Sequence, residues 1–289
     1  MPDALKGILA QARRDRVADL CRAYVACGHN TKTAIARALG TLGDSRAVAV
    51  LLKDLHSVWT DLTLIQYDAQ IEALGALKAN EAADQLLQIL RHQYSWEGSS
   101  WRIKGNVFVA LGKIGDERAL PDASRYVESE TDWDVKQAAL NYLIHINNGT
   151  ARAALWRAYQ RSQEPEVALC LVQVGETSVL PDVRIRLSKW LDDFATGGWS
   201  KTDYWGVFYC VHALLSAGDD DAVRELRRAL EMFKKPNAET ERYIDEAANR
   251  FTRRLLLDER KAQALLPELE RFLAKHPATV RQPPPANFQ

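Results

Sequence analysis

The sequence lacks an excess of charge of either sign, because 38 lysines and arginines are matched by 38 aspartates and glutamates. No field over the whole surface therefore attracts nucleic acid or an anionic membrane, and any electrostatic preference must be local. The sequence also lacks an apolar run long enough to cross a bilayer, and its first apolar stretch is too short for a signal peptide. We therefore expect a cytoplasmic protein with no membrane partner.

Cysteines are few, and none forms a C-x-x-C pair. The four are Cys21, Cys27, Cys170 and Cys210, and each lies among apolar residues in a helical pattern. Small thiols in such a setting are typical of a core in a reducing compartment. The pattern predicts free, buried thiols rather than disulfides or a metal site.

Motifs for the common classes of chemistry are absent as well. The sequence has no G-x-S-x-G, no P-loop and no dinucleotide fingerprint, and helix ends account for its glycines. It has no His-Glu pair that could begin a metal site. We predict no metal site and no cofactor, and the sequence identifies no catalytic residue.

What the sequence does have is an internal repeat. The tripeptide Ala-Leu-Gly stands at 38–40, 73–75 and 110–112, and its leucine defines an anchor that recurs at intervals of 35, 37, 32, 28 and 43 residues. The anchors are Leu39, Leu74, Leu111, Leu143, Leu171 and Leu214. Periods of this length are typical of α-solenoids, in which stacked helix pairs bury one continuous core.

Positions that did not define the anchors share the same register. The fourth residue after each anchor suits the end of a helix in most repeats, and the six are Gly43, Lys78, Gly115, Asn147, Gly175 and Gly218. An acidic or amide residue follows in all repeats but one, as at the start of a second helix. Apolar residues then stand eight, twelve and sixteen after the anchor, which predicts one buried stripe. Each unit therefore reads as helix A, a tight turn and helix B.

Three stretches carry a resemblance to a known repeat family. They are ALGKIGDERALP (110–121), DWDVKQAALNYL (132–143) and VGETSVLP (174–181), with Lys32, Lys104 and Lys136 in a basic position of the unit. These stretches resemble the short HEAT repeat named after phycobilisome lyases. In repeat four Ile144 and Asn147 replace glycines, and the insertion DDFATGGWSKTDYW precedes repeat six, so regular curvature is not expected after Leu143.

The resemblance implies an all-α fold, a right-handed α-solenoid of about seven HEAT-like helix pairs. We expect residues 2–27 to form an N-terminal cap and residues 239–257 and 262–275 to form the last pair. The solenoid would be a single domain over residues 1–275, followed by a Pro-rich extended or disordered tail over 276–289.

One column of B-helix residues should face away from the core. At about 100° per residue, the position fourteen after each anchor points opposite to the buried stripe. Its occupants are Lys53, Gln88, Arg125, Arg157, Ile185 and Arg228, of which four are cationic and none is acidic. We call these residues the outward column and expect them to line a concave surface. They could bind an acidic protein segment, or they could be an ordinary solvated face.

Tryptophans form the second candidate feature. The loops from each B helix to the next A helix carry Trp59, Trp96, Trp101, Trp133, Trp199 and Trp205. Exposed tryptophans on one rim would be typical of an interface, whereas indoles packed between repeats would be structural. We favour packing for Trp133 and Trp205, and both interpretations stay open for Trp96 and Trp199.

The leading hypothesis is a non-enzymatic scaffold that binds a protein or peptide partner. The candidate contacts are Lys53, Gln88, Arg125, Arg157, Arg228, Trp96, Trp101 and Trp199. An alternative is a lyase or isomerase subunit similar to the phycobilin lyases, which handle an open-chain tetrapyrrole. A third is a nucleic-acid binder similar to HEAT-like DNA glycosylases, since Trp199 lies four residues before Asp203, but such enzymes need a strongly basic face.

Overall fold

The computed structural model describes residues 3–56, 67–92, 97–129, 133–195, 201–234 and 259–275, and every regular element among them is helical. The α-helices are α1 (Asp3–Ala26), α2 (His29–Leu42), α3 (Val48–His56), α5 (Asp68–Ala76), α6 (Ala83–Arg91), α7 (Glu97–Ile114), α8 (Leu120–Glu128), α9 (Trp133–Ile146), α10 (Gly149–Ser162), α11 (Pro165–Gln173), α12 (Leu180–Ala195), α13 (Lys201–Ala217), α14 (Val223–Lys234) and α16 (Glu259–Lys275). Short 3-10 turns, η1 (Ser45–Ala47), η3 (Asn80–Ala82), η4 (Glu117–Ala119) and η5 (Asp220–Ala222), lead into four B helices. The all-α prediction is confirmed for these residues.

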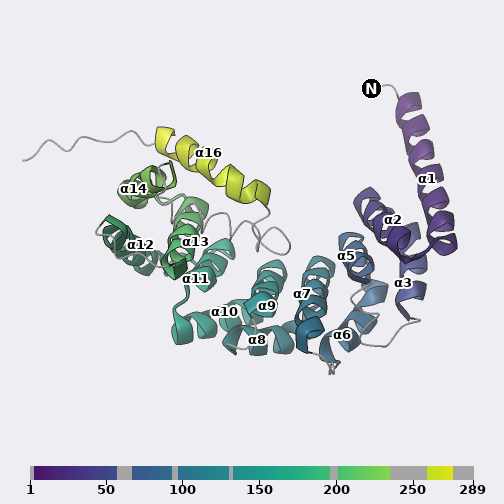
Figure 1. Ribbon diagram of the computed structural model, residues 1–289, viewed down its shortest axis with the longest axis horizontal. Coiled ribbons are helices and arrows are strands. Elements are labelled where there is room, and N and C mark those ends of the chain that lie inside the picture. The colour runs from purple at the N-terminus through teal and green to yellow at the C-terminus, as the bar shows by residue number, and fades with distance from the viewer. Residues whose placement is uncertain are drawn as a thin grey trace, which may run out of the picture. The chain divides into compact units, whose positions relative to one another are not determined.

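The helices form two compact units, residues 1–162 and residues 163–289. In the first unit α2, α5, α7 and α9 pack on one another in chain order, as the A row, while α3, α6, α8 and α10 form the B row (Figure 1). In the second unit α11 packs on α13, α12 packs on α13 and α14, and α16 contacts α13 and α14. The single domain over 1–275 stays a prediction, and the tail over 276–289 lies outside the described residues.

The A row of the first unit lies on the inner side of its curve, and the B row lies on the outer side (Figure 1). The expectation that B helices line a concave surface is therefore wrong for this unit. The physical reason is that glycine and alanine let the A helices approach closely at two of the interfaces, whereas α6 meets α8 and α8 meets α10 through arginine and carboxylate side chains.

The turn after each A helix has the backbone conformation that the repeat pattern predicts. The fourth residue after every anchor has positive φ: Gly43 68°, Lys78 51°, Gly115 86°, Asn147 45°, Gly175 89° and Gly218 64°. Left-handed residues at this point end an α-helix and turn the chain back. The six predicted helix ends are confirmed.

Short side chains then hold the start of the B segment. Asp44, Asp116 and Asp219 each accept a hydrogen bond from the backbone N–H two residues later. Asn148 accepts one from the N–H of Ala151 at 2.9 Å, at the start of α10. These acceptors satisfy N–H groups that have no partner within the helix.

The predicted buried stripe forms the core. All six anchor leucines have an exposed fraction of 0%. The residues eight and twelve after them are buried in every repeat: Ala47, Leu51, Ala82, Leu86, Ala119, Ala123, Ala151, Leu155, Val179, Val183, Ala222 and Leu226. At position sixteen only Leu230 is half-buried instead of buried. The phase of the B helices is therefore confirmed.

The Ala-Leu-Gly tripeptide marks the contact between successive A helices. A Cβ on Gly40 would lie 2.9 Å from the Cα of Ala73, and one on Gly75 would lie 2.7 Å from the Cα of Ala110. The glycine of one tripeptide thus faces the alanine of the next, and the two backbones touch. At Gly112 the nearest neighbours, at 3.3 Å, include the Cα of Tyr142, so this contact is looser.

A polar network attaches the N-terminal helix α1 to the first repeats. The hydroxyl of Tyr24 donates to Asp54 at 2.8 Å and accepts from the amide of Gln70 at 3.0 Å. The ammonium group of Lys32 donates to the other oxygen of Asp54 at 2.7 Å. Burial and the neighbouring carboxylate raise the pKa of Tyr24, so its hydroxyl keeps its proton. This network fits the capping role predicted for α1.

Replacing Gly75 with alanine tests the contact between A helices. The added Cβ would meet backbone atoms of Ala110, so we expect the free energy of unfolding to fall by about 1–3 kcal/mol. Urea unfolding followed by circular dichroism measures the change. Gly149→Ala is the matched control, because a Cβ there meets nothing within 4 Å. Equal losses in the two variants would contradict the proposed contact.

The turn carboxylate Asp116 should make stability depend on pH. Hydrogen bonds from Arg118 hold the pKa of Asp116 below its usual value, despite its partial burial. A lowered folded-state pKa adds stability that is present above about pH 4 and lost as pH falls through the folded-state pKa.

We therefore expect Asp116→Asn, which keeps the capping oxygen, to lower the free energy of unfolding by about 0.5–1.5 kcal/mol at pH 7. The difference from the unsubstituted protein should shrink below pH 4, and urea unfolding at pH 7, 5 and 3 measures it. Glu117→Gln removes an exposed neighbouring carboxylate and serves as the control. A difference that stays constant between pH 7 and pH 3 would refute the role of the charge.

Candidate partner-binding surface

The outward column faces solvent in the first unit, as the repeat register predicts. Lys53 on α3, Gln88 on α6, Arg125 on α8 and Arg157 on α10 are all exposed. In the second unit Ile185 is 69% exposed and Arg228 is half-buried. Within each unit these side chains are accessible to a partner.

Three arginines of the column also form ion pairs. Arg157 contacts Glu128 on the preceding B helix at 3.0 Å, and Arg228 contacts Asp192 at 2.6 Å. Arg125 makes a longer contact of 3.4 Å with Asp122 and lies over the ring of Tyr126 at 5.3 Å. Exposed ion pairs stabilise a fold by about 0–1 kcal/mol each. An acidic group from a partner could therefore exchange with these carboxylates at small cost.

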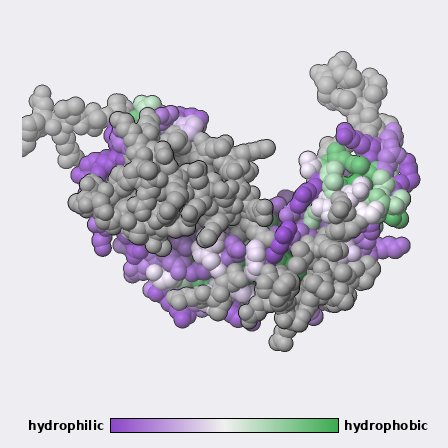
Figure 2. Space-filling view, viewed as in Figure 1, coloured by the Kyte–Doolittle hydropathy of each residue, from purple (hydrophilic) through white to green (hydrophobic). Residues whose placement is uncertain are grey.

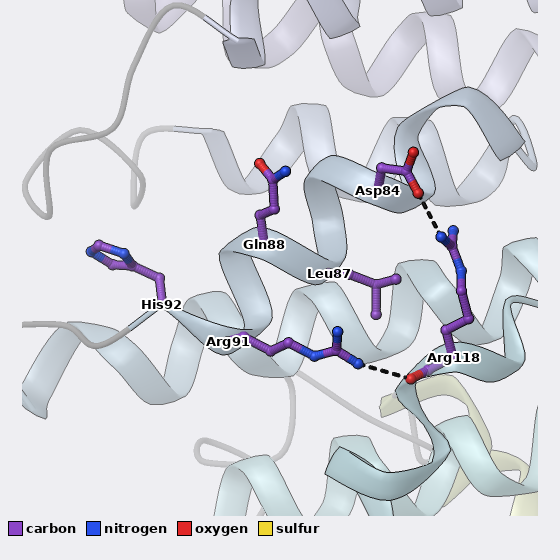
Figure 3. A pocket seen from close by; sticks show the side chains of 6 residues that line it. All are labelled: Asp84, Leu87, Gln88, Arg91, His92 and Arg118. Carbon is purple, nitrogen blue, oxygen red and sulfur yellow. Dashed lines mark hydrogen bonds and ion pairs between the residues drawn. The ribbon is translucent and has the colours of Figure 1, made fainter.

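A hollow lies beside α6, facing the η4 turn that leads into α8. Its volume is about 580 Å³ and it is lined by Asp84, Leu87, Gln88, Arg91, His92 and Arg118 (Figure 3). In Figure 3 Leu87 lies between the guanidinium groups of Arg91 and Arg118, and the side chains of Gln88 and His92 extend away from Arg118. One member of the outward column, Gln88, thus borders a concave site.

Two arginines bridge the hollow. Arg118 contacts Asp84 on α6 and Asp116 in its own turn, both at 2.6 Å. Arg91 contacts Asp122 on α8 at 3.0 Å and donates to the backbone carbonyl of Arg118 at 3.0 Å. The hydrogen bonds to Asp116 and Asp84 raise the pKa of Arg118 further above its already high value, so this group is always charged. Three carboxylates thus face two guanidinium groups here, and both guanidinium groups are paired.

Sequence reasoning did not single out this hollow. Arg118 and Asp84 are 34 residues apart, and neither stands in the outward column. The sequence marks these two residues only by their positions in the repeat: Arg118 stands seven residues after its anchor, and Asp84 stands ten residues after the previous anchor. Only the stacking of two neighbouring repeats shows that the side chains at these two positions are in contact.

The predicted tryptophan rim is described only in part. Trp101 on α7 is half-buried, and Trp133 at the start of α9 is 45% exposed, more than expected for an indole packed between repeats. Trp59, Trp96 and Trp199 lie outside the described residues, as does the side chain of Trp205. Among the residues that the structure describes, no tryptophan lines the hollow beside α6.

Polar groups dominate the visible surface. In Figure 2 most described atoms are hydrophilic, and hydrophobic atoms gather over the N-terminal helices α1 and α2. Val25 on α1 is 70% exposed. Recognition on the B row must therefore depend mainly on charge and hydrogen bonds.

The described residues contain no group of three His, Cys, Asp or Glu side chains placed to hold a metal ion. All four cysteines are free; Cys170 and Cys210 are buried, while Cys21 and Cys27 are half-buried. Burial raises the pKa of the Cys210 thiol to about 12, and it raises that of Cys170 as well. These two thiols are therefore neutral and poor nucleophiles at pH 7.

None of the described helices combines the length and the apolarity that a membrane span requires. Among curated proteins, none matches the chain. A family model for the PBS lyase HEAT-like repeat matches residues 32–53, which run from α2 through the turn at Gly43 into α3. With the helical pairs, the left-handed turns and the stacked A row, this match supports a HEAT-repeat, PBS-lyase-like architecture.

Proposed function

We propose that this protein is a non-enzymatic scaffold that binds a protein or peptide on the outer face of its B helices and on the rim that bears the tryptophans. The observation that carries the proposal is the outward column, whose first-unit members are all exposed and include no carboxylate. An acidic segment is the partner that this column fits best. The proposal includes a cytoplasmic location and a right-handed superhelix of about seven helix pairs.

The repeat architecture supports binding over catalysis. Stacked repeats use one face of each helix to bury the core, which leaves the other faces as extended surfaces that a partner can contact. Fold alone does not define function, so the support must come from the exposed residues themselves. Here those residues are arginine, lysine and glutamine in the first unit, spaced by about 10 Å between neighbouring helices.

Charge reversal at two positions tests this proposal. Arg125→Glu combined with Arg157→Glu would replace attraction for an acidic partner with repulsion, so we expect capture from an extract of the source cells to fall at least about tenfold. Capture by the immobilised protein, followed by mass spectrometry and titration of the purified candidate partner, measures the change.

The matched control is Arg37→Glu with Lys113→Glu, which makes the same charge change at exposed positions of the A row. We expect both double variants to unfold within about 1 kcal/mol of the unsubstituted protein, since the ion pairs affected are exposed. Undiminished capture by the Arg125 and Arg157 variant would remove the outward column as the binding surface.

A further inference from the structure

We infer that the hollow between α6 and the η4 turn is a binding site for a glutamate or aspartate side chain of a partner protein, and that Asp84 occupies part of this site in the free protein. The inference rests on the proposed function and goes further, because it locates one contact and names the chemistry of the group that binds. It does not depend on Arg125 or Arg157.

Hydrogen-bond donors without partners border the hollow. Arg91 uses its Nε and one terminal nitrogen, bonding to Asp122 and to the carbonyl of Arg118. Its other terminal nitrogen makes no hydrogen bond among the residues that the structure describes, and neither does the side-chain amide of Gln88. A carboxylate has two oxygens that can accept from such donors, and the flat guanidinium group suits it.

The ion pair between Arg118 and Asp84 can open at little cost. Its distance is 2.6 Å, but the side chain of Asp84 is 80% exposed and that of Arg118 is 55% exposed. By contrast, the second carboxylate on Arg118, Asp116, is only 11% exposed and also holds the turn. An incoming carboxylate would therefore displace Asp84 and leave Asp116 in place.

The remaining charges favour one carboxylate over a phosphate backbone. Asp84, Asp116 and Asp122 all lie in or behind the hollow, where they would repel a dianionic phosphate or a run of phosphates. The Asp84 side chain is 80% exposed and turns into solvent when it is displaced, so one carboxylate replaces another at Arg118 and the number of charges on this guanidinium stays the same. The unused donors of Arg91 and Gln88 then bind the incoming group. Leu87 on the floor offers contact to the methylene groups of the bound side chain.

Nuclear magnetic resonance titration of the full chain tests this site. The probe is the peptide Glu-Leu-Glu-Leu-Glu with acetylated and amidated ends, and the peptide with glutamine in place of glutamate is its neutral counterpart. We expect the acidic peptide to shift the side-chain resonances of Gln88 and Arg91 at low ionic strength, and the neutral peptide to leave them unchanged.

Three variants test which side chains at the hollow determine the affinity for the acidic peptide. Asp84→Asn frees Arg118, so the peptide should bind about threefold to fivefold more tightly, the size expected from an exposed ion pair. Glu117→Gln removes an equal charge from an exposed position nearby and keeps the Arg118 pairs, so its affinity should stay at the unsubstituted value. Arg91→Gln removes a donor and should weaken binding at least about threefold, with an unchanged circular dichroism spectrum.

Other outcomes would overturn the inference. Equal tightening by Asp84→Asn and Glu117→Gln would mean that only net charge matters. Free glutamate that shifts the same resonances as strongly as the peptide would indicate a small-acid site, and tighter binding of a single-stranded oligonucleotide would indicate a phosphate site. If the peptide binds while the Arg125 and Arg157 variant still captures its partner, the hollow remains a binding site and the outward column is ruled out. If the peptide does not bind while that variant loses capture, the hollow alone is ruled out.

Discussion

The contact between A-helix backbones is the constraint on which the first unit depends. At Gly75 the space for a side chain is filled by Ala110, and at Gly40 it is filled by Ala73. Protein interiors are packed too densely to absorb an extra group without a shift of the backbone. The Ala-Leu-Gly tripeptide therefore recurs because packing requires it. The glycine of one tripeptide touches the alanine of the next, and the leucine fills the core.

The A helices touch at their backbones, whereas neighbouring helices of the B row contact each other through longer side chains. On the outer side, α6 is bridged to α8 by the pair of Arg91 with Asp122 and to the η4 turn by the pair of Arg118 with Asp84, and a hollow lies beside these pairs. Further along, α8 and α10 pack on each other directly and share the pair of Arg157 with Glu128. The inner row is thus held by close backbone contacts as well as by the ion pairs of Arg37 with Glu72 and of Arg102 with Asp68, whereas these contacts of the outer row are made by charged side chains.

The difference between the buried core and the exposed outer face indicates which residues are available to bind a partner. Apolar residues at the anchors and in the buried stripe are fully used by the core, and the two most buried thiols keep their protons at neutral pH. The groups left for recognition are the arginines, glutamines and carboxylates of the outer face. Surfaces of this kind give specificity through the position and sign of charge more than through buried area.

The sequence by itself determined the helix ends, the turn carboxylates and the phase of the buried stripe. Gly115, Asp116 and Leu111 could be assigned because a left-handed residue, a cap and a 3.6-residue period are local properties of the chain. Only the tertiary structure decided that the B row of the first unit lies outside, that Arg157 meets Glu128 and that Arg118 meets Asp84. These depend on the distance and tilt between stacked repeats, which arise from the sum of many contacts between residues far apart in the chain.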